Sequence, residues 1–171
     1  GTGTFTVNEN TTLNLGSITA GTVRATSLNS GIVNTAGAIN ATNLFVSAGS
    51  IFSPNDISLT ASGNLINNVT ILNANNFSLT AAPLTGTTTT VTAGSATQSS
   101  RSVLGNFNVS VVGNNNLSVG TAGGGSFNNI GFSLSSTSVV PNTVTINAPG
   151  NITVQNATST GTGTITINAP G

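Results

Sequence analysis

A three-residue motif recurs along this chain: an aliphatic residue, then Thr or Asn, then Ala. Its six copies begin at Ile18, Ile39, Leu59, Leu79, Ile146 and Ile167. Successive copies follow one another at nearly constant spacing, and the one long gap, from Leu79 to Ile146, is close to three further steps. A period near ~20 residues is typical of a chain that winds into stacked coils.

The motif also predicts which side chains face the core, because side chains alternate between the two faces of a strand. The aliphatic residue and the alanine two places later should point inward, and the residue between them should point outward. The expected inward column is Ile18, Ile39, Leu59, Leu79, Ile146, Ile167, Ala20, Ala41, Ala61, Ala81, Ala148 and Ala169. The expected outward ladder is Thr19, Asn40, Thr60, Thr80, Asn147 and Asn168.

Strand signals dominate the whole chain. Gly, Thr, Asn and Ser are abundant, and all are weaker helix formers than Ala or Leu. Alternating segments such as Val109–Val111 and Ile165–Ile167 indicate short strands. Tight hairpins favour Asn-Gly or Asp-Gly, and neither pair occurs. We therefore predict an all-β parallel β-helix, or solenoid, with about 20 residues per coil and about eight coils. Residues 1–171 form a single domain in this prediction, with irregular coils or loops within 83–131.

Charged residues are nearly absent, and this excludes several kinds of site. The charged side chains are Arg24, Arg101, Glu9 and Asp56, with no Lys, His or Cys. Proton-transfer chemistry needs clustered titratable groups, zinc needs His or Cys, and nucleic acid needs a basic surface. We expect no catalytic, cofactor-binding or metal-binding residues and no nucleic-acid partner. Glu9 and Asp56 should be isolated surface charges in different columns. So little charge favours an extracellular or cell-surface location, and no apolar run reaches the ~18 residues of a transmembrane helix.

Three stretches carry a family resemblance: Gly16–Gly21, Ala36–Ala41 and Asp56–Leu65. They resemble the repeats of filamentous-haemagglutinin-type adhesins, which are exported by two-partner secretion. The resemblance covers most of residues 16–81 and 143–171. It implies a right-handed parallel β-helix, an extracellular location and a role as an adhesin shaft, and it carries over no catalytic residue.

The two ends of the sequence resemble each other, since Gly1–Asn8 parallels Gly161–Asn168 position by position. Either the chain continues in further coils or identical units stack end to end, so the expected partner is the protein itself. A host-surface or glycan receptor is a second expected partner.

Three functions remain open at this stage. The first is a non-catalytic shaft of an extracellular fibre or adhesin. The second is a small subunit that polymerises into a pilus-like filament, including a β-sandwich completed by a donated strand, with Thr2–Leu15 as the candidate donor. The third is an ice- or carbohydrate-binding solenoid, because Thr143 and Thr145 align with Thr164 and Thr166 one coil later. The motif copies do not extend this threonine array, which favours ordinary solvent-facing threonines.

Overall fold

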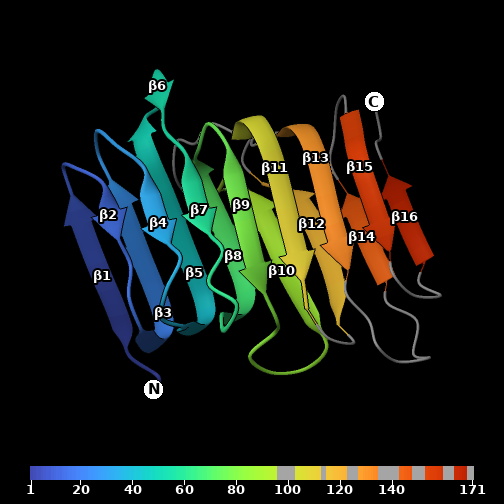
Figure 1. Cartoon of the computed structure of the whole chain (residues 1–171), viewed down its shortest axis with the longest axis horizontal. Coiled ribbons are helices and arrows are strands. Elements are labelled where there is room, and N and C mark those ends of the chain that lie inside the picture. The colour runs from blue at the N-terminus through green and yellow to red at the C-terminus, as the bar shows by residue number, and fades with distance from the viewer. Residues whose placement is uncertain are drawn as a thin grey trace.

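The computed structural model describes residues 1–95, 103–112, 115–122, 127–134, 143–147, 153–159 and 164–168. Every element in these ranges is a β-strand, and the strands form two sheets that face each other (Figure 1). Sheet A runs in the order β1 (Thr4–Glu9), β3 (Ile18–Ser27), β5 (Ile39–Ser50), β8 (Leu65–Asn73), β10 (Thr88–Ala93), β12 (Asn116–Thr121), β14 (Thr143–Asn147) and β16 (Thr164–Asn168). Sheet B runs in the order β2 (Leu13–Asn14), β4 (Ile32–Asn34), β7 (Ile57–Leu59), β9 (Phe77–Ala81), β11 (Val103–Val111), β13 (Phe127–Leu134) and β15 (Thr153–Ser159).

The chain is a parallel β-solenoid, as predicted. Apart from β6, strands that follow one another in sequence alternate between the two sheets, so one turn contains one strand of each. All neighbouring strands in sheets A and B are parallel, which excludes the alternative of an antiparallel β-sandwich. The short strand β6 (Ser53–Pro54) pairs with β5 in the antiparallel sense.

Turn length varies more than the motif spacing suggests. A turn takes about 22 residues on average, and the unbroken stretch 1–95 makes about four turns. The first of these turns is the shortest and the third is the longest. Their lengths follow from the partners in sheet A, which are Thr4 with Thr22, Ile18 with Ile39, Asn40 with Leu65 and Asn68 with Thr90.

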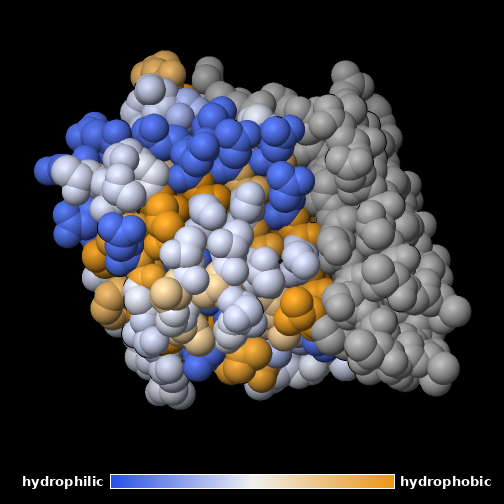
Figure 2. Space-filling view, viewed as in Figure 1, coloured by the Kyte–Doolittle hydropathy of each residue, from blue (hydrophilic) through white to orange (hydrophobic). Residues whose placement is uncertain are grey.

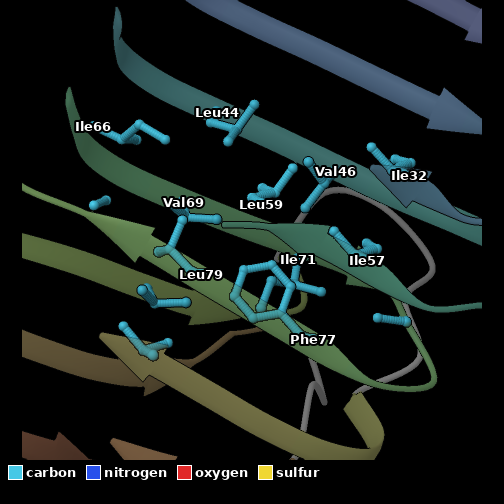
Figure 3. Close-up of a cluster of buried hydrophobic side chains, with 14 of the residues drawn as sticks. Ile32, Leu44, Val46, Ile57, Leu59, Ile66, Val69, Ile71, Phe77 and Leu79 are labelled. Atoms are coloured by element: carbon cyan, nitrogen blue, oxygen red, sulfur yellow. The ribbon is translucent and has the colours of Figure 1, made fainter. Parts of the chain in front are cut away.

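The core lies between the two sheets and is one continuous cluster (Figure 3). Leu44 and Ile71 enter it from sheet A, and Ile57 and Leu59 enter it from sheet B. Because each sheet buries one face against the other, both sheets show the same alternation of buried aliphatic and outward polar residues. Phe77 extends the cluster into a stacked pair with Phe107, whose ring centroids lie 5.6 Å apart.

The six motif copies belong to separate ladders, which corrects the expectation of one column. Ile18 lies opposite Ile39 in sheet A, whereas Leu59 lies opposite Leu79 in sheet B. The step from Ile39 to Leu59 therefore crosses from one sheet to the other within a turn. Ile146 pairs with Ile167 in a third ladder. The motif occurs in strands of both sheets, because both sheets need alternating buried and outward side chains. Its spacing equals the turn length only in part of the chain.

The interval 83–131 continues the two sheets with longer turns. It contains β10, β11, β12 and the start of β13. Thr88 lies opposite Asn116 in sheet A, and Phe77 lies opposite Phe107 in sheet B. Both pairs are further apart in sequence than any pair of partners that precedes them. The polar segments 96–102, 113–114 and 123–126, where loops were expected, lie outside the described residues.

Candidate functional surfaces

The outer face of sheet A carries a continuous row of hydroxyl and amide side chains. One residue of each strand contributes: Thr4, Thr22, Asn43, Asn68, Thr90, Ser118, Thr145 and Thr166. In the middle of the row the Asn68 Nδ2 donates to Asn43 Oδ1 at 3.0 Å, so these side chains bond across coils. This row could not be predicted from the motif spacing, because the sequence separation between its members differs from one turn to the next.

The neighbouring outward row is less regular. Its members are Thr6, Arg24, Phe45, Thr70, Thr92 and Gly120, and the backbone register continues from Gly120 to Asn147 and Asn168. The Arg24 guanidinium lies 4.1 Å from the centroid of the Phe45 ring, a cation–π contact between adjacent coils. The predicted alignment of Thr143 and Thr145 with Thr164 and Thr166 is confirmed by the β14–β16 register. Arg24, Phe45 and Gly120 nevertheless interrupt a two-column threonine array.

A second ladder runs along the corner where the chain enters sheet B. Asp56 directly precedes β7, and its Oδ1 accepts hydrogen bonds from Asn75 Nδ2 at 2.9 Å and from both Asn76 N and Asn76 Nδ2 at 3.0 Å. In the next turn Asn76 precedes β9, and its Oδ1 accepts from Asn106 N at 2.9 Å. Figure 2 shows a band of strongly hydrophilic side chains across the part of this face where the sheet B strands begin. Asp56 is thus an exposed residue that bonds one coil to the next, and the signal for it is an Asp or Asn immediately before an apolar strand.

Three buried asparagines bond to backbone groups inside the turns. Asn64 takes the next place after Ile18 and Ile39 in their ladder: its Oδ1 accepts from Ile39 N at 2.9 Å, and its Nδ2 donates to the carbonyl groups of Leu59 and Thr80. The Asn34 Nδ2 donates to the carbonyl group of Leu15 in the preceding turn and to that of Gly37 in its own corner. The Asn73 Nδ2 donates to carbonyl groups of residues 48–50 in the preceding turn. The hydrogen-bonded Nδ2 groups of these side chains hold the corners in place. The Oδ1 atoms of Asn34 and Asn73 are buried without a hydrogen-bond partner.

The predicted inward residues are mostly buried in the structure. Ile39, Leu59 and Leu79 are at most 2% exposed, and Ile18 packs half-buried against the core. The motif alanines in the first four copies are also buried, namely Ala20, Ala41, Ala61 and Ala81. The last two motif alanines, Ala148 and Ala169, lie outside the described residues.

The predicted outward residues do not form one ladder. Thr19 lies opposite Asn40 in sheet A, and Asn147 lies opposite Asn168. Thr60 and Thr80 belong to the sheet B side of the solenoid. Thr19 and Thr60 are exposed, whereas Asn40 and Thr80 are half-buried.

The described residues contain no cluster of titratable side chains. Glu9 ends β1 in sheet A, while Asp56 lies at the corner that leads into sheet B, so the two acids occupy different ladders. Among the residues that the structure describes, no group of three or more His, Cys, Asp or Glu is placed to hold a metal ion. The same ranges contain no helix long and apolar enough to cross a membrane. Arg101 lies outside them.

No protein-family model, curated protein or solved structure matches this chain. The resemblance to filamentous-haemagglutinin-type adhesins therefore rests on the repeated motifs alone.

Proposed function

We propose that this chain is a length of non-catalytic shaft in an extracellular or cell-surface fibre or adhesin. The observation that supports it best is the parallel order of sheet A, which continues from β1 to β16. Each turn bonds to the next through the backbone, through one continuous core and through side-chain ladders such as Asp56–Asn76–Asn106. The stability of such an array is a sum of contributions from each turn and from each interface between neighbouring turns. Further turns can therefore be added with the same contacts.

The finer geometry belongs to the same proposal. We take each strand of sheet A as one coil, which makes about eight coils, and we take the coils to wind right-handed, as in the adhesins that the motifs resemble. At ~4.8 Å between neighbouring strands, the rod is roughly 40 Å long. A crystal structure that showed left-handed coils would contradict this part of the proposal.

The shaft has a direct structural test. Oriented fibres of the native product should diffract with a repeat of ~4.8 Å along the fibre axis, because parallel coils stack along the rod. A ~4.8 Å repeat perpendicular to that axis would contradict the shaft. An antibody against the chain should label intact cells of the source organism. Labelling that occurs only after the cells are permeabilised would contradict the extracellular location.

The alternative of a small subunit that polymerises non-covalently predicts a different native mass. A subunit made of this chain alone has a mass of 16.7 kDa, whereas a continuous shaft is a much larger polypeptide. Mass spectrometry of the denatured native product separates the two, because denaturation dissociates subunits and leaves a continuous chain intact.

Carbohydrate or ice binding is a further candidate, and the polar row on sheet A favours it. This row places a hydroxyl or amide side chain on each strand from Thr4 to Thr166. A glycan array and a thermal-hysteresis measurement test the two ligands. Thr22→Leu, on the row, should abolish a positive signal, whereas Thr60→Leu, on the sheet B side, should leave it unchanged. Negative results in both measurements remove this candidate.

A further inference from the structure

A positively charged side chain lies on the outer face of sheet A, among uncharged polar residues. Val23 and Ala25 are buried, so Arg24 between them points outward, and it is exposed. Its partners on the neighbouring strands are Thr6 and Phe45. Within the strands that the structure describes, Arg24 is the only basic residue of sheet A.

The Arg24 guanidinium is positioned by an aromatic ring. It lies 4.1 Å from the centroid of the Phe45 ring, and a cation–π attraction acts between the charge and the face of the ring. Among the residues that the structure describes, none accepts a hydrogen bond from this guanidinium. Arginine presents its N–H groups as a planar fork that matches the two oxygens of a carboxylate. The fork is therefore placed and available for an anionic ligand.

The chain supplies no carboxylate partner for this charge. Its acidic side chains are Glu9 and Asp56. Glu9 lies opposite Ser27, which is buried, so Glu9 and Arg24 belong to opposite sets of alternating positions. Asp56 lies at the corner that leads into sheet B and accepts three hydrogen bonds there. A carboxylate that pairs with Arg24 has to come from another molecule.

The side chains around Arg24 match a ligand rich in hydroxyl groups. Thr22 and Thr26 lie two residues to either side of it, and Asn43 and Ser47 occupy the matching positions of the next strand. Hydroxyl and amide groups donate and accept hydrogen bonds, as the hydroxyl groups of sugars do. Nucleic acid would need a surface with several cations, which these positions lack. A sugar that carries a carboxylate matches a single guanidinium surrounded by hydroxyl and amide groups.

We propose that the outer face of sheet A binds an acidic glycan, in which a uronic-acid carboxylate pairs with Arg24 and sugar hydroxyl groups bond to Thr22 and Asn43. The proposal rests on the carbohydrate-binding function suggested by the polar row and specifies the class of sugar. Because the site is exposed and contains one charge, binding is weak and becomes weaker as the salt concentration rises.

A glycan array that pairs each uronic-acid oligosaccharide with its neutral methyl ester tests the ligand class. The wild-type chain should bind the acidic members, and their esters should bind at least about fivefold more weakly, because an ester has no charge to pair with the guanidinium. Equal binding of acids and esters overturns the acidic-glycan proposal and leaves carbohydrate binding in place. Absence of binding to every glycan removes both.

Variants of Arg24, measured by isothermal titration calorimetry with the acidic oligosaccharide that binds best, test the residue. Arg24→Gln should weaken binding at least about fivefold. Arg24→Lys should have an intermediate affinity, because lysine keeps the charge but lacks the planar fork. The matched control combines Arg24→Gln with Thr60→Arg, which restores the net charge on the sheet B side and should not restore binding. Unchanged affinity in Arg24→Gln, or affinity restored by Thr60→Arg, overturns the proposal.

A nitrogen–proton correlation spectrum tests the contact in the unaltered chain. The arginines of the chain are Arg24 and Arg101, so the arginine Nε–H signal that is lost in Arg24→Gln belongs to Arg24. In the wild-type chain this signal should shift during titration with the acidic oligosaccharide and stay in place during titration with the methyl ester. A signal that stays in place while calorimetry detects binding of the acid overturns the pairing with Arg24.

Discussion

At the scale of single residues, the core of this solenoid combines apolar burial with a few buried amides. Leu59 is fully buried between the sheets, while Thr60 beside it is exposed. Leu59, the last residue of β7, and Thr60, which directly follows it, thus meet opposite environments, which makes them a matched pair for testing the direction of the side chains.

Leu59→Asp should destabilise the chain by about 3–5 kcal/mol, the range for a charge left buried without a partner. Thr60→Asp should change stability by less than about 0.5 kcal/mol, because its side chain stays in water. Thermal unfolding followed by circular dichroism measures both. Equal stability of the two variants would contradict the inward direction of Leu59.

Asn73 is buried, and its Nδ2 group donates hydrogen bonds to three backbone carbonyl oxygens. Asn73→Ala should cost about 1–3 kcal/mol of unfolding free energy, because buried carbonyl groups lose their donor. Asn73→Asp should cost more than the alanine variant, because a carboxylate replaces the donor and faces the same oxygens. Urea denaturation orders the three proteins, and an aspartate variant as stable as wild type would show that donation is not the role of Asn73.

At the scale of elements, the corners rather than the strands distinguish one turn from another. At the corner that leads into sheet B, Asp56 and Asn76 have the same role in successive turns. The side-chain Oδ1 of each accepts a hydrogen bond from a backbone N–H group in the following turn. The acceptor oxygen, and not the charge, is the common feature.

Asp56→Asn should therefore leave stability within about 0.5 kcal/mol of wild type. Asp56→Ala removes the acceptor of three hydrogen bonds and should lower stability by at least about 0.5–1.5 kcal/mol, the net worth of one typical hydrogen bond. Equilibrium denaturation at neutral pH makes the comparison. A loss in Asp56→Asn as large as that in Asp56→Ala would mean that the negative charge is needed.

The β5–β6 hairpin depends on Gly49, and Gly86 supplies its control. Both have a positive φ, 73° and 74°, but an added Cβ at Gly49 would meet the carbonyl oxygen of Ser53, whereas the space at Gly86 is open. Gly86→Ala should cost about 1–2 kcal/mol from backbone conformation alone. Gly49→Ala should cost more, because a steric clash is added. Urea denaturation tests this order, and an equal cost for both variants would show that the hairpin backbone moves freely to relieve the contact.

At the scale of the whole molecule, turns are repeated units of unequal length. Asn40 lies opposite Leu65, so removing residues 40–64 takes out one complete turn. The shortened chain should keep a β-sheet spectrum and cooperative unfolding, because each remaining turn still stacks on a neighbour.

Removing residues 40–59 follows the motif spacing instead. It joins Ile39, at the start of a sheet A strand, to Thr60, which directly follows the sheet B strand β7. The register of both sheets is lost at the junction, and this chain should unfold at a lower temperature than the one without residues 40–64. Equal thermal stability of the two chains would contradict the two-sheet register.

The fold class followed from local chemistry. Alternating aliphatic and polar residues, weak helix formers and the absence of Asn-Gly turns indicate stacked parallel strands, because these properties act within a few residues of each other. The burial of Ile39, Leu59 and the motif alanines could likewise be predicted from alternation alone.

Only the tertiary structure decided which strands are neighbours. Sheets A and B demand the same alternation, so the motif at Ile39 and at Leu59 looks like one repeat although the two residues lie in different sheets. Because the turns differ in length, the sequence separation of hydrogen-bonded partners is not constant. A fixed period therefore could not predict that Asn68 bonds to Asn43 or that Asn76 bonds to Asp56. Local pattern determines whether a residue faces in or out, whereas the register between turns depends on corner geometry and on contacts between residues distant in sequence.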